Sequence, residues 1–481
     1  MITPPVYVIN RAQDTARLER FSDSATGLGL SVTRIEAIDG HDPATPLFLY
    51  RHLLRDRFRG GTDIKPGALG CYLSHMAAWR KLISDGHEVA LICEDDVVLR
   101  TVPPMPDVVA DIIFVNDRLQ AWRAGIDGGP ASVPVSAIIS ALSGNGQEPG
   151  QNGLASAPGA DAYLLTRRGA ERLLALTAAH GIITGVDWAM IGFSTAASAL
   201  VNWAEAKGVA EIEEADRLRA VIGAEAIGGV ADAAGGSTIG HKTLIAIADC
   251  AATPRIKGLP DLPEDPVCTS LAAGRYAEEP ALEMMYRWFP KGGTFVDIGA
   301  HVGAHSLFML RHGGAAKAIP FEFHGRAIEG LKHLMGENGL AELVDISHLG
   351  LGLTEDTGKR ALRGPDKYPY GARLKPDFTE DIKVRAGDSL LRDEAGIAMI
   401  KIDVNGDERE VLKGLKKTMK RKRPLLAIDM TAEKSAKARP ILTRHFYTEA
   451  ETAEWAENGI TKRFAIFHCD GPPAGVRAAG G

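Results

Sequence analysis

Short apolar runs of strand length alternate with stretches of helical periodicity along most of the chain. In the N-terminal half, Val6–Ile9, Val89–Cys93 and Ala162–Leu165 have the length of strands. Residues 66–84 predict a helix, because Pro66 suits a first helical turn and apolar residues recur at helical spacing. Val89–Cys93 is apolar on both faces, which is typical of a buried parallel strand, and such strands hold ligands at their C-terminal ends.

A second alternation begins near residue 294. Strands are expected at 294–298, 318–322, 345–352, 398–404 and 425–429, with helices starting at 303, 325 and 407. This order indicates βαβ units and a parallel sheet, and the proline density of 253–266 is that of a linker. The pattern therefore predicts an α/β protein of two different domains, at 1–245 and 276–435, joined by a Pro-rich linker at 246–275 and followed by a tail of unknown role at 436–481.

Composition narrows the class of protein. The 481 residues provide about two or three domains, and a net charge of −6 argues against a nucleic-acid partner. The five scattered cysteines form no C-x-x-C pair and indicate reduced thiols. The N-terminus lacks the pattern of a signal peptide, and no apolar run approaches the ~20 residues of a membrane span. We therefore expect a cytoplasmic protein, for which peripheral association with a membrane stays open.

Three adjacent carboxylates, Glu94, Asp95 and Asp96, follow the run Val89–Cys93. Carboxylates this close raise one another's pKa unless a cation lies among them. Mn²⁺ or Mg²⁺ prefers such oxygens together with a diphosphate, and an enzyme with a nucleotide-sugar donor needs that arrangement to stabilise the departing diphosphate. A solvated acidic turn explains the three residues equally well.

The sequence around this strand resembles glycosyltransferase family 25, which includes lipooligosaccharide and collagen galactosyltransferases. The resemblance covers about 1–245 without the 124–160 region, and its matching motifs are Val8-Ile9-Asn10, Ile38-Asp39-Gly40, Lys65 to Leu99, Ala162-Tyr163-Leu164-Leu165 and Val186-Asp187-Trp188. It implies a GT-A-like nucleotide-sugar fold with a UDP-sugar donor and a glycan acceptor. Asp96, with Asp95, would bind the metal, and Glu94 would lie nearer the ribose of the nucleotide.

Inverting transfer requires a general base for the acceptor hydroxyl. Asp187 is our candidate, although a role as helix N-cap or structural acid is equally reasonable. Ser74 and His75 lie inside the expected helix, near the site but not catalytic. Residues 124–160, rich in Gly, Ser, Pro and Ala, predict a long mobile loop or a partly disordered segment. This segment and the Ala/Gly-rich 205–235 depart from the family pattern.

A glycine turn follows the strand at 294–298, with Gly299 and Gly303 in G-x-x-x-G spacing. That spacing differs from the G-x-G-x-x-G that holds a dinucleotide pyrophosphate, so a cofactor without phosphates, such as S-adenosylmethionine, fits better. Glu322 ends the next strand, where an acid can accept hydrogen bonds from ribose hydroxyls. A plain strand–helix connection is the alternative.

The C-terminal half also resembles a known family, the FkbM methyltransferases, over about 280–430. The matching segments are Asp297 to Leu307, Glu322, Asn338, Met399 to Glu408, Val411 to Gly414 and Pro424 to Asp429. The resemblance implies a Rossmann-like domain that transfers a methyl group from S-adenosylmethionine to a hydroxyl oxygen, commonly of a sugar. In it, Asp297, Gly299 and Gly303 would line the methionine end of the cofactor, and Glu322 would bind its ribose.

Two further residues of this domain are catalytic candidates. Lys401 and Asp403 end an expected strand and so lie over the site, where Asp403 could orient or deprotonate the acceptor hydroxyl or have a purely structural role. Phe323 and Asn405 depart from the family, which usually has Pro and Glu at these positions. The basic run 413–423 fits a solvated helix face, or a contact to the phosphates of an anionic glycan.

The sequence therefore predicts a bifunctional enzyme, a metal-dependent glycosyltransferase fused to an O-methyltransferase, in the synthesis of a cell-surface glycan such as lipopolysaccharide. The rival hypothesis keeps only the methyltransferase active and makes the N-terminal domain a non-catalytic module that binds a sugar nucleotide or a glycan. A non-enzymatic scaffold is the third reading, and it would require that neither cofactor binds.

Overall fold

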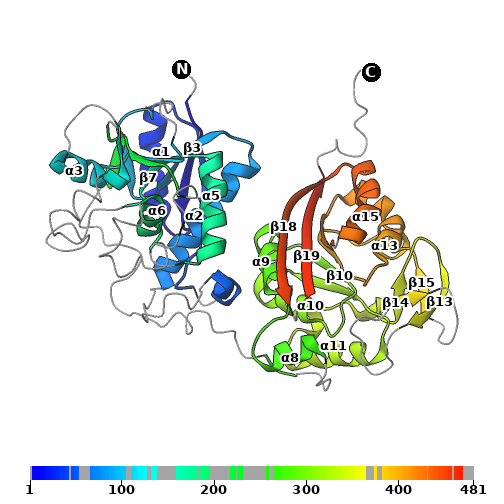
Figure 1. Cartoon of the computed structure of the whole chain (residues 1–481). Helices are drawn as coiled ribbons and strands as arrows, with labels where there is room; N and C mark the ends of the chain where they lie inside the picture. Colours follow the sequence, from blue (N-terminus) through cyan, green and yellow to red (C-terminus); the bar gives the residue numbers. More distant parts are fainter. Residues whose placement is uncertain are drawn as a thin grey trace, which may run out of the picture. The chain divides into compact units, whose positions relative to one another are not determined.

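The computed structural model divides into two compact units, Met1–Ala252 and Thr253–Gly481, each described here by itself (Figure 1). Each unit combines a sheet with helices, as the predicted α/β class requires. Among the described helices, none has both the length and the apolar character needed to cross a membrane. The structure describes residues 3–42, 45–53, 66–103, 110–126, 132–137, 159–182, 185–195, 212, 217–223, 225–230, 256–258, 265–363, 373–375, 382–430, 432–457 and 460–469.

The N-terminal unit is built on a seven-stranded sheet with the order β2-β1-β3-β7-β5-β8-β6. Its central strand β3 pairs in parallel with β1 and antiparallel with β7. The expectation of a parallel strand is therefore met on one side of β3 only. The elements are β1 (Val6–Asn10), α1 (Thr15–Gly27), β2 (Val32–Glu36), a 3-10 helix (Leu47–Leu53), α2 (Pro66–Ser84), β3 (Val89–Glu94), β4 (Val97–Leu99), β5 (Ile112–Phe114), α3 (Asp117–Ile126), β6 (Val133–Pro134), β7 (Ala162–Thr166), α5 (Arg167–His180), α6 (Val186–Ser194), β8 (Ala220–Ile222) and β9 (Gly228–Val230).

Helix α2 buries more than half of its 19 residues and packs against α5 (Figure 1). A Cβ on Gly70 would lie 2.5 Å from the carbonyl oxygen of Ile38, so the absence of a side chain lets the loop after β2 lie directly on the helix. Ser74 fixes the same contact, because its hydroxyl accepts a hydrogen bond from the Ile38 amide at 2.8 Å and donates one to Gly70. Ser74 thus has a structural role here.

The C-terminal unit contains a six-stranded sheet with the order β11-β10-β16-β17-β19-β18, parallel except around β19. Strand order reverses between β10 and β16, and the crevice at such a reversal is where open α/β sheets bind ligands. The elements are α8 (Pro266–Ala272), α9 (Glu279–Trp288), β10 (Thr294–Ile298), α10 (Ala304–Phe308), a π-helical turn (Met309–Gly313), β11 (Lys317–Phe321), α11 (Gly325–Glu337), 3-10 turns (Ala341–Leu343 and Ile346–His348), β12 (Leu351–Leu353), β13 (Gly358–Arg363), β14 (Arg373–Lys375), β15 (Ile382–Arg385), α12 (Gly387–Leu390), β16 (Ile397–Ile402), α13 (Glu408–Gly414), α14 (Lys416–Lys422), β17 (Leu425–Asp429), α15 (Ala432–Arg444), β18 (Tyr447–Glu457) and β19 (Ile460–Cys469).

Four expectations about this half need correction. The strand expected at 345–352 is a 3-10 turn followed by the short β12, and the helix expected from 407 is divided into α13 and α14. Helix α8 lies inside the predicted linker and starts at Asp265, whose carboxylate accepts hydrogen bonds from two backbone amides of the first turn. The 436–481 segment, to which the sequence assigns no role, supplies most of α15 and the antiparallel strands β18 and β19 that complete the sheet.

The two segments that depart from the family pattern lie mostly outside the described residues. Within 124–160 the structure describes 124–126, 132–137, 159 and 160, and within 205–235 it describes 212, 217–223 and 225–230.

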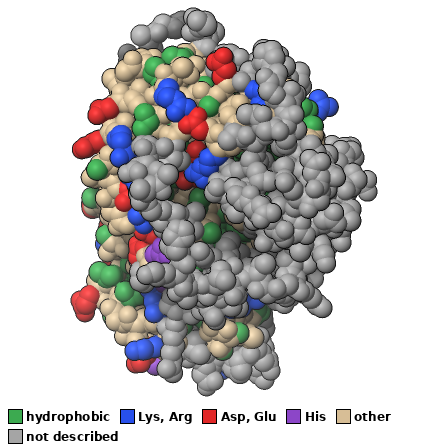
Figure 2. All heavy atoms as spheres, turned by 90° about the vertical axis from the view of Figure 1, so that its left-hand side faces the viewer, with side chains coloured by type: hydrophobic (Ala, Val, Ile, Leu, Met, Phe, Trp, Pro, Cys, Tyr) green, Lys and Arg blue, Asp and Glu red, His purple; other side chains and the backbone are tan. Residues whose placement is uncertain are grey.

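On the face shown in Figure 2, basic and acidic side chains of the described residues are interspersed.

Candidate functional site

The three consecutive carboxylates at the end of β3 have different surroundings. The Asp95 carboxylate accepts a hydrogen bond from Asn10 Nδ2 at 2.7 Å and pairs with Arg17 at 3.4 Å. Since both of its oxygens have partners on β1 and α1, Asp95 ties β3 to these elements. Predicted as a metal ligand together with Asp96, it is the less available of the two.

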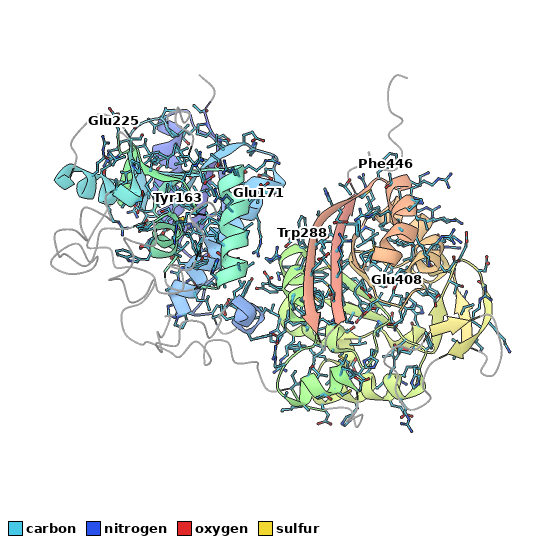
Figure 3. The ribbon with its side chains drawn as sticks, in the orientation of Figure 1. Tyr163, Glu171, Glu225, Trp288, Glu408 and Phe446 are labelled. Carbon is cyan, nitrogen blue, oxygen red and sulfur yellow. The ribbon has the colours of Figure 1, made fainter. Side chains whose placement is uncertain are left out.

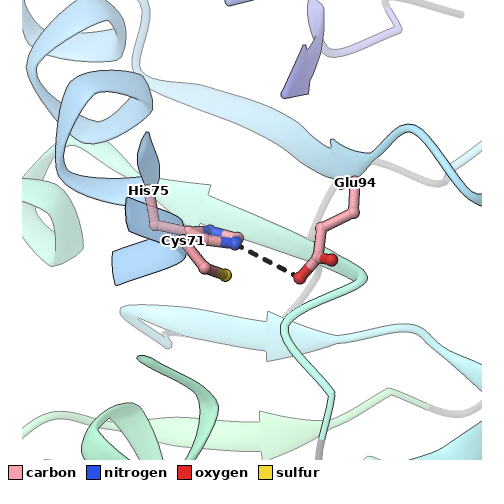
Figure 4. Close-up of side chains that lie close together, drawn as sticks. All are labelled: Cys71, His75 and Glu94. Carbon is pink, nitrogen blue, oxygen red and sulfur yellow. Dashed lines mark ion pairs between the residues drawn. The ribbon is translucent and has the colours of Figure 1, made fainter. Parts of the chain in front are cut away.

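Glu94 faces helix α2 rather than α1. His75 Nε2 lies 3.4 Å from Glu94 Oε1, and the Cys71 thiol belongs to the same cluster (Figure 4). Burial pushes the pKa of Glu94 upward, but the adjacent His75 ring and then the charges of Arg118 and Arg17 hold the pKa of this carboxyl below its usual value. Glu94 is therefore an ionised group at neutral pH.

The other acids at this edge of the sheet behave in the opposite way. Burial, followed by the negative charge of Glu94, raises the pKa of Asp96 to about 6. Burial likewise raises the pKa of Asp187 to about 6, and that of Asp161 to about 7. Asp96 Oδ1 and both carboxylate oxygens of Asp161 are buried without a hydrogen bond among the described residues. The site therefore has more negative charge than its own cations balance.

Asp161 is the residue that sequence reasoning missed. It immediately precedes β7, and its carbonyl oxygen accepts the Glu94 amide at 2.9 Å, so the two acids lie on adjacent chains. Arg118 Nε is 3.6 Å from its carboxylate. The available signal was an acid just before an apolar strand, but only the antiparallel pairing of β7 with β3 brings that acid to the carboxyl end of β3.

Asp187 lies in the first turn of α6, where Gly185 occupies the N-cap position. The alternative that Asp187 is the N-cap of this helix is therefore wrong. Its roles as a general base or as a structural acid stay predictions. The Asp187 carboxylate accepts the Trp188 amide at 2.8 Å, and Glu94 is close enough to contribute to its raised pKa.

A pocket that is open to solvent lies at the carboxyl ends of β10, β11 and β16 in the C-terminal unit. Of the predicted residues, Gly299, Glu322, Lys401 and Asp403 line it. Asp297 lies beneath it with no exposed surface, and Gly303 has a φ of 84° as the N-cap of α10. The tertiary structure thus brings most of the residues predicted for the cofactor into one place.

Gly299 is required by its backbone and by its neighbour. Its φ is 77°, and a Cβ there would lie 1.9 Å from the carbonyl oxygen of Asp403. Beneath the turn, Lys401 Nζ donates to the Gly299 carbonyl at 2.7 Å and pairs with Asp297 at 3.1 Å. Although burial pushes the pKa of Lys401 downward, Asp297 and then Asp403 raise it above its usual value. Lys401 is therefore a charged support of the turn, and its catalytic role stays a prediction.

Glu322 is held rigidly at the end of β11. Its carboxylate accepts hydrogen bonds from the backbone amides of His301, Phe323 and His324 at 2.8, 2.8 and 2.9 Å. A carboxylate offers about four acceptor positions, so capacity for a further donor is left. Phe323, which departs from the family's Pro, contributes an amide that proline lacks.

Three residues with side chains line this pocket in the left-handed region of φ: Glu278, His301 and Asn405, at 58°, 52° and 56°. Such conformations cost of order 1–3 kcal/mol each and gather at functional sites. Asn tolerates this region better than most residues, which suits Asn405 as a replacement for the family's Glu. Glu278, which sequence reasoning missed, pairs with Lys462 of β19 at 3.1 Å and lies 3.4 Å from His305.

Acidic groups are concentrated beside the pocket. Carboxylate oxygens of Asp403, Glu408 and Asp429, at the ends of β16 and β17 and the start of α13, lie within 4.8 Å of one another. Figure 3 shows Glu408 within the second unit, as Tyr163 is within the first. Asp403 keeps both predicted possibilities, a role toward the acceptor and a structural role in this cluster.

Comparison with known proteins supports the family resemblance of the N-terminal region. The model of "Glycosyltransferase family 25 (LPS biosynthesis protein)" matches residues 3–103. A "Glycosyltransferase 25 family member" of Aedes aegypti is 28% identical over 131 residues, which is 24% of this chain and 20% of that protein. A "Probable inactive glycosyltransferase 25 family member 3" of Rattus norvegicus is 29% identical over 98 residues, 19% of this chain and 17% of that protein. The chain thus spans about a fifth of the length of these relatives.

Solved structures similar to the chain include methyltransferases, as the predicted fusion requires. Methyltransferase FkbM from Methylobacillus flagellatus is 16% identical with a TM-score of 0.28, covering 39% of this chain and 58% of that one. A tRNA methyltransferase of Streptococcus pneumoniae in complex with S-adenosyl-L-methionine is 13% identical with a TM-score of 0.28, covering 41% and 75%. These scores are too low to carry an argument, so the assignment of the C-terminal unit depends on its strand order and its pocket.

Proposed function

We propose that the chain is a bifunctional transferase. Its N-terminal unit performs metal-dependent, inverting hexosyl transfer from a UDP-sugar to a glycan acceptor, and its C-terminal unit methylates a sugar hydroxyl with S-adenosylmethionine. We place both reactions in the cytoplasmic synthesis of a cell-surface glycan such as lipopolysaccharide. The observation that carries the proposal is the pocket at the strand-order reversal, in which the glycine turn of Gly299 lies beside the carboxylate of Glu322.

The charge of this pocket supports S-adenosylmethionine over a phosphate-containing cofactor. Four acidic residues line the pocket against two lysines, namely Glu278, Glu322, Asp403 and Asp407 against Lys401 and Lys462. A sulfonium cation is favoured by such a lining, whereas a pyrophosphate is repelled. When bound, the cofactor supplies an electrophilic methyl group.

The protein's own residues then have distinct tasks. Gly299 lets the backbone approach the ligand, and Glu322 has acceptor capacity for the ribose hydroxyls. Asp403 is our candidate to orient the acceptor hydroxyl and take its proton, as the carboxylate at the end of β16.

The N-terminal site fits a hard divalent cation, Mn²⁺ or Mg²⁺. The buried Asp96 Oδ1 has no hydrogen-bond partner among the described residues, and burial, followed by the negative charge of Glu94, raises the pKa of this carboxyl to about 6. Asp96 would hold the ion, with Asp95 as the weaker candidate because its oxygens have partners. The ion would neutralise charge on the departing diphosphate.

Two carboxyls compete for the role of general base. Asp187, predicted from the sequence, has a pKa of about 6, and Asp161 has a pKa of about 7. Both values lie near the operating pH, where a base is most effective. Substituting each by Asn separately and comparing the rates of transfer identifies the base.

A second function is favoured by one specific observation: the matched relative of Rattus norvegicus carries the word inactive in its name. In this alternative only the methyltransferase turns over, and the N-terminal unit binds a sugar nucleotide or a glycan. Loss of transfer with retained UDP binding would support it.

Calorimetric titrations test both halves. UDP is titrated with and without Mn²⁺ into the full chain, into Asp96→Ala and into Glu88→Gln, a control at a residue whose side chain is 86% exposed. We expect metal-dependent UDP binding that only Asp96→Ala abolishes, and a loss of transfer on the order of 10²-fold or more in that variant. S-adenosylmethionine is titrated into the same proteins and should bind all three equally. UDP binding that ignores both metal and mutation would contradict the glycosyltransferase half, and failure to bind S-adenosylmethionine would contradict the other half.

A further inference from the structure

Cys71, His75 and Glu94 converge in the N-terminal unit, with one potential ligand atom of each within 4.8 Å of the others (Figure 4). Cys71 and His75 lie four residues apart on one face of α2, and Glu94 ends β3. Thiol, imidazole and carboxylate form a donor set that suits zinc. The same three groups can also form a cluster without a metal. The positions of the protons on these groups distinguish a zinc site from such a cluster.

His75 belongs to a buried chain of polar groups. Its Nδ1 lies 2.8 Å from the Tyr163 hydroxyl oxygen, and Trp79 Nε1 donates to the same oxygen at 2.8 Å. All three side chains have no exposed surface. The rings of His75 and Tyr163 also stack, with centroids 5.7 Å apart, which holds the imidazole in one orientation.

The donors and acceptors of this chain allow one assignment of protons. The indole N–H of Trp79 can only donate, so the Tyr163 oxygen accepts from it. The hydroxyl proton of Tyr163 then needs an acceptor, because an unpaired buried donor is costly. His75 Nδ1 is the nearest one, so it carries no proton. The proton of the neutral ring is on Nε2, which faces Glu94 Oε1 at 3.4 Å and makes no regular hydrogen bond among the described residues.

We propose that His75 is a positioning residue, fixed by Trp79 and Tyr163 in the Nε2–H tautomer so that its ring N–H orients the Glu94 carboxylate. The ligand of Glu94 under the proposed function is the ribose of the donor nucleotide, so this part of the inference rests on that function. An oriented carboxylate binds two adjacent hydroxyls with less loss of rotamer freedom than a free one.

The same proton assignment argues against a metal at this cluster. A metal on His75 Nε2 requires the proton to move to Nδ1, which would leave the Tyr163 hydroxyl without its acceptor. Cys71 would also have to lose its thiol proton among several carboxylates. The cluster is therefore an oriented His–Glu pair.

Two measurements test this without any nucleotide. The full chain is labelled with ¹⁵N-histidine, and the His75 ring signals are identified by their absence in His75→Gln. We expect the Nε2–H tautomer in the parent protein and a mixture of tautomers in Tyr163→Phe; a protonated Nδ1 in the parent overturns the proposal. Zinc content is then compared between the parent protein and Cys71→Ala, where equal content is expected and the loss of one equivalent overturns it.

Titration of UDP in the presence of Mn²⁺ tests the consequence for binding. His75→Leu should weaken binding about 10-fold, while His75→Gln, whose amide N–H takes the place of Nε2–H, should stay within about 3-fold of the parent. Equal weakening by both variants, or by neither, overturns the positioning role. If the parent protein itself binds no UDP, the proposed function fails, and the tautomer measurement alone decides whether His75 is fixed toward Glu94.

Discussion

The two candidate sites differ in how their buried carboxylates are partnered. At the end of β3 in the N-terminal unit, Asp96 and Asp161 have buried oxygens that make no hydrogen bond within the described part of the chain, and both have raised pKa values. In the C-terminal pocket, Asp297 is paired with Lys401, and Glu322 accepts three backbone amides. The first site therefore leaves carboxylate oxygens available to a cation from outside, whereas the protein's own groups hold the carboxylates of Asp297 and Glu322 in the second.

This difference indicates what each site requires of its ligand. A site with surplus buried carboxylate is stabilised when a divalent ion enters, so ligand affinity at the N-terminal unit should depend on metal and on pH. A site whose acids are already fixed can bind a cofactor directly, so affinity at the C-terminal pocket should depend on backbone geometry. The following changes probe this contrast, starting with the largest expected effect.

Asp297→Asn removes the partner of a fully buried lysine. Breaking a buried pair by removing one member costs about 3–5 kcal/mol, because the other charge stays buried and uncompensated. Urea unfolding of the full chain should show this loss, and Asp297→Asn combined with Lys401→Met should recover part of it. If the single variant unfolds at the same urea concentration as the parent, the pocket is not held together by its own charges.

Gly299→Ala places a Cβ against the Asp403 carbonyl in a left-handed backbone. We expect S-adenosylmethionine affinity to fall on the order of 10²-fold in calorimetry, since the strand and turn must separate to accept the methyl group. Gly292→Ala is the matched control, because its φ is 81° but no atom lies within 4 Å of the added Cβ. If both variants lose the same S-adenosylmethionine affinity, the cause is backbone strain and not the contact between the added Cβ and the Asp403 carbonyl.

Asp161→Asn should stabilise the protein at alkaline pH. Burial raises the pKa of Asp161 to about 7 from the 3.8 of an unperturbed aspartate. The native state therefore binds more protons than the unfolded state between these pH values, and stability falls as pH rises through that range. Removing the charge should raise the free energy of unfolding at pH 8 by on the order of 2 kcal/mol and change it little near pH 4. A gain that is the same at both pH values would assign the effect to packing. Asp117→Asn, at an exposed ion pair with Arg100, is the control.

The smallest effect expected is a pH-dependent shift of the melting temperature by Mn²⁺. Asp96 has a pKa of about 6 and must be deprotonated to bind a cation, so metal affinity falls as pH decreases through 6. Mn²⁺ should therefore raise the melting temperature by a few degrees at pH 7.5 and by much less at pH 5.5. In Asp96→Asn the shift should vanish at both values, and a shift that persists there would place the metal elsewhere.

The sequence by itself determined the local features of both units. Apolar runs of strand length predicted β1, β3, β10, β11, β16 and β17, and the glycine turn at Gly299 predicted the position of the pocket in the second unit. These features are local, because they depend on side chains and backbone conformations within a few residues of one another.

Only the tertiary structure decided which distant residues complete each site. Asp161 reaches Glu94 because β7 runs antiparallel to β3, and Lys462 reaches Glu278 because β19 is inserted beside β17. The neighbouring carboxylates also differ because different elements pack on each: Asp95 has partners on both oxygens, whereas one oxygen of Asp96 has none among the described residues. Strand order, burial and electrostatic environment all depend on contacts between residues far apart in the chain. A local sequence pattern therefore cannot predict them.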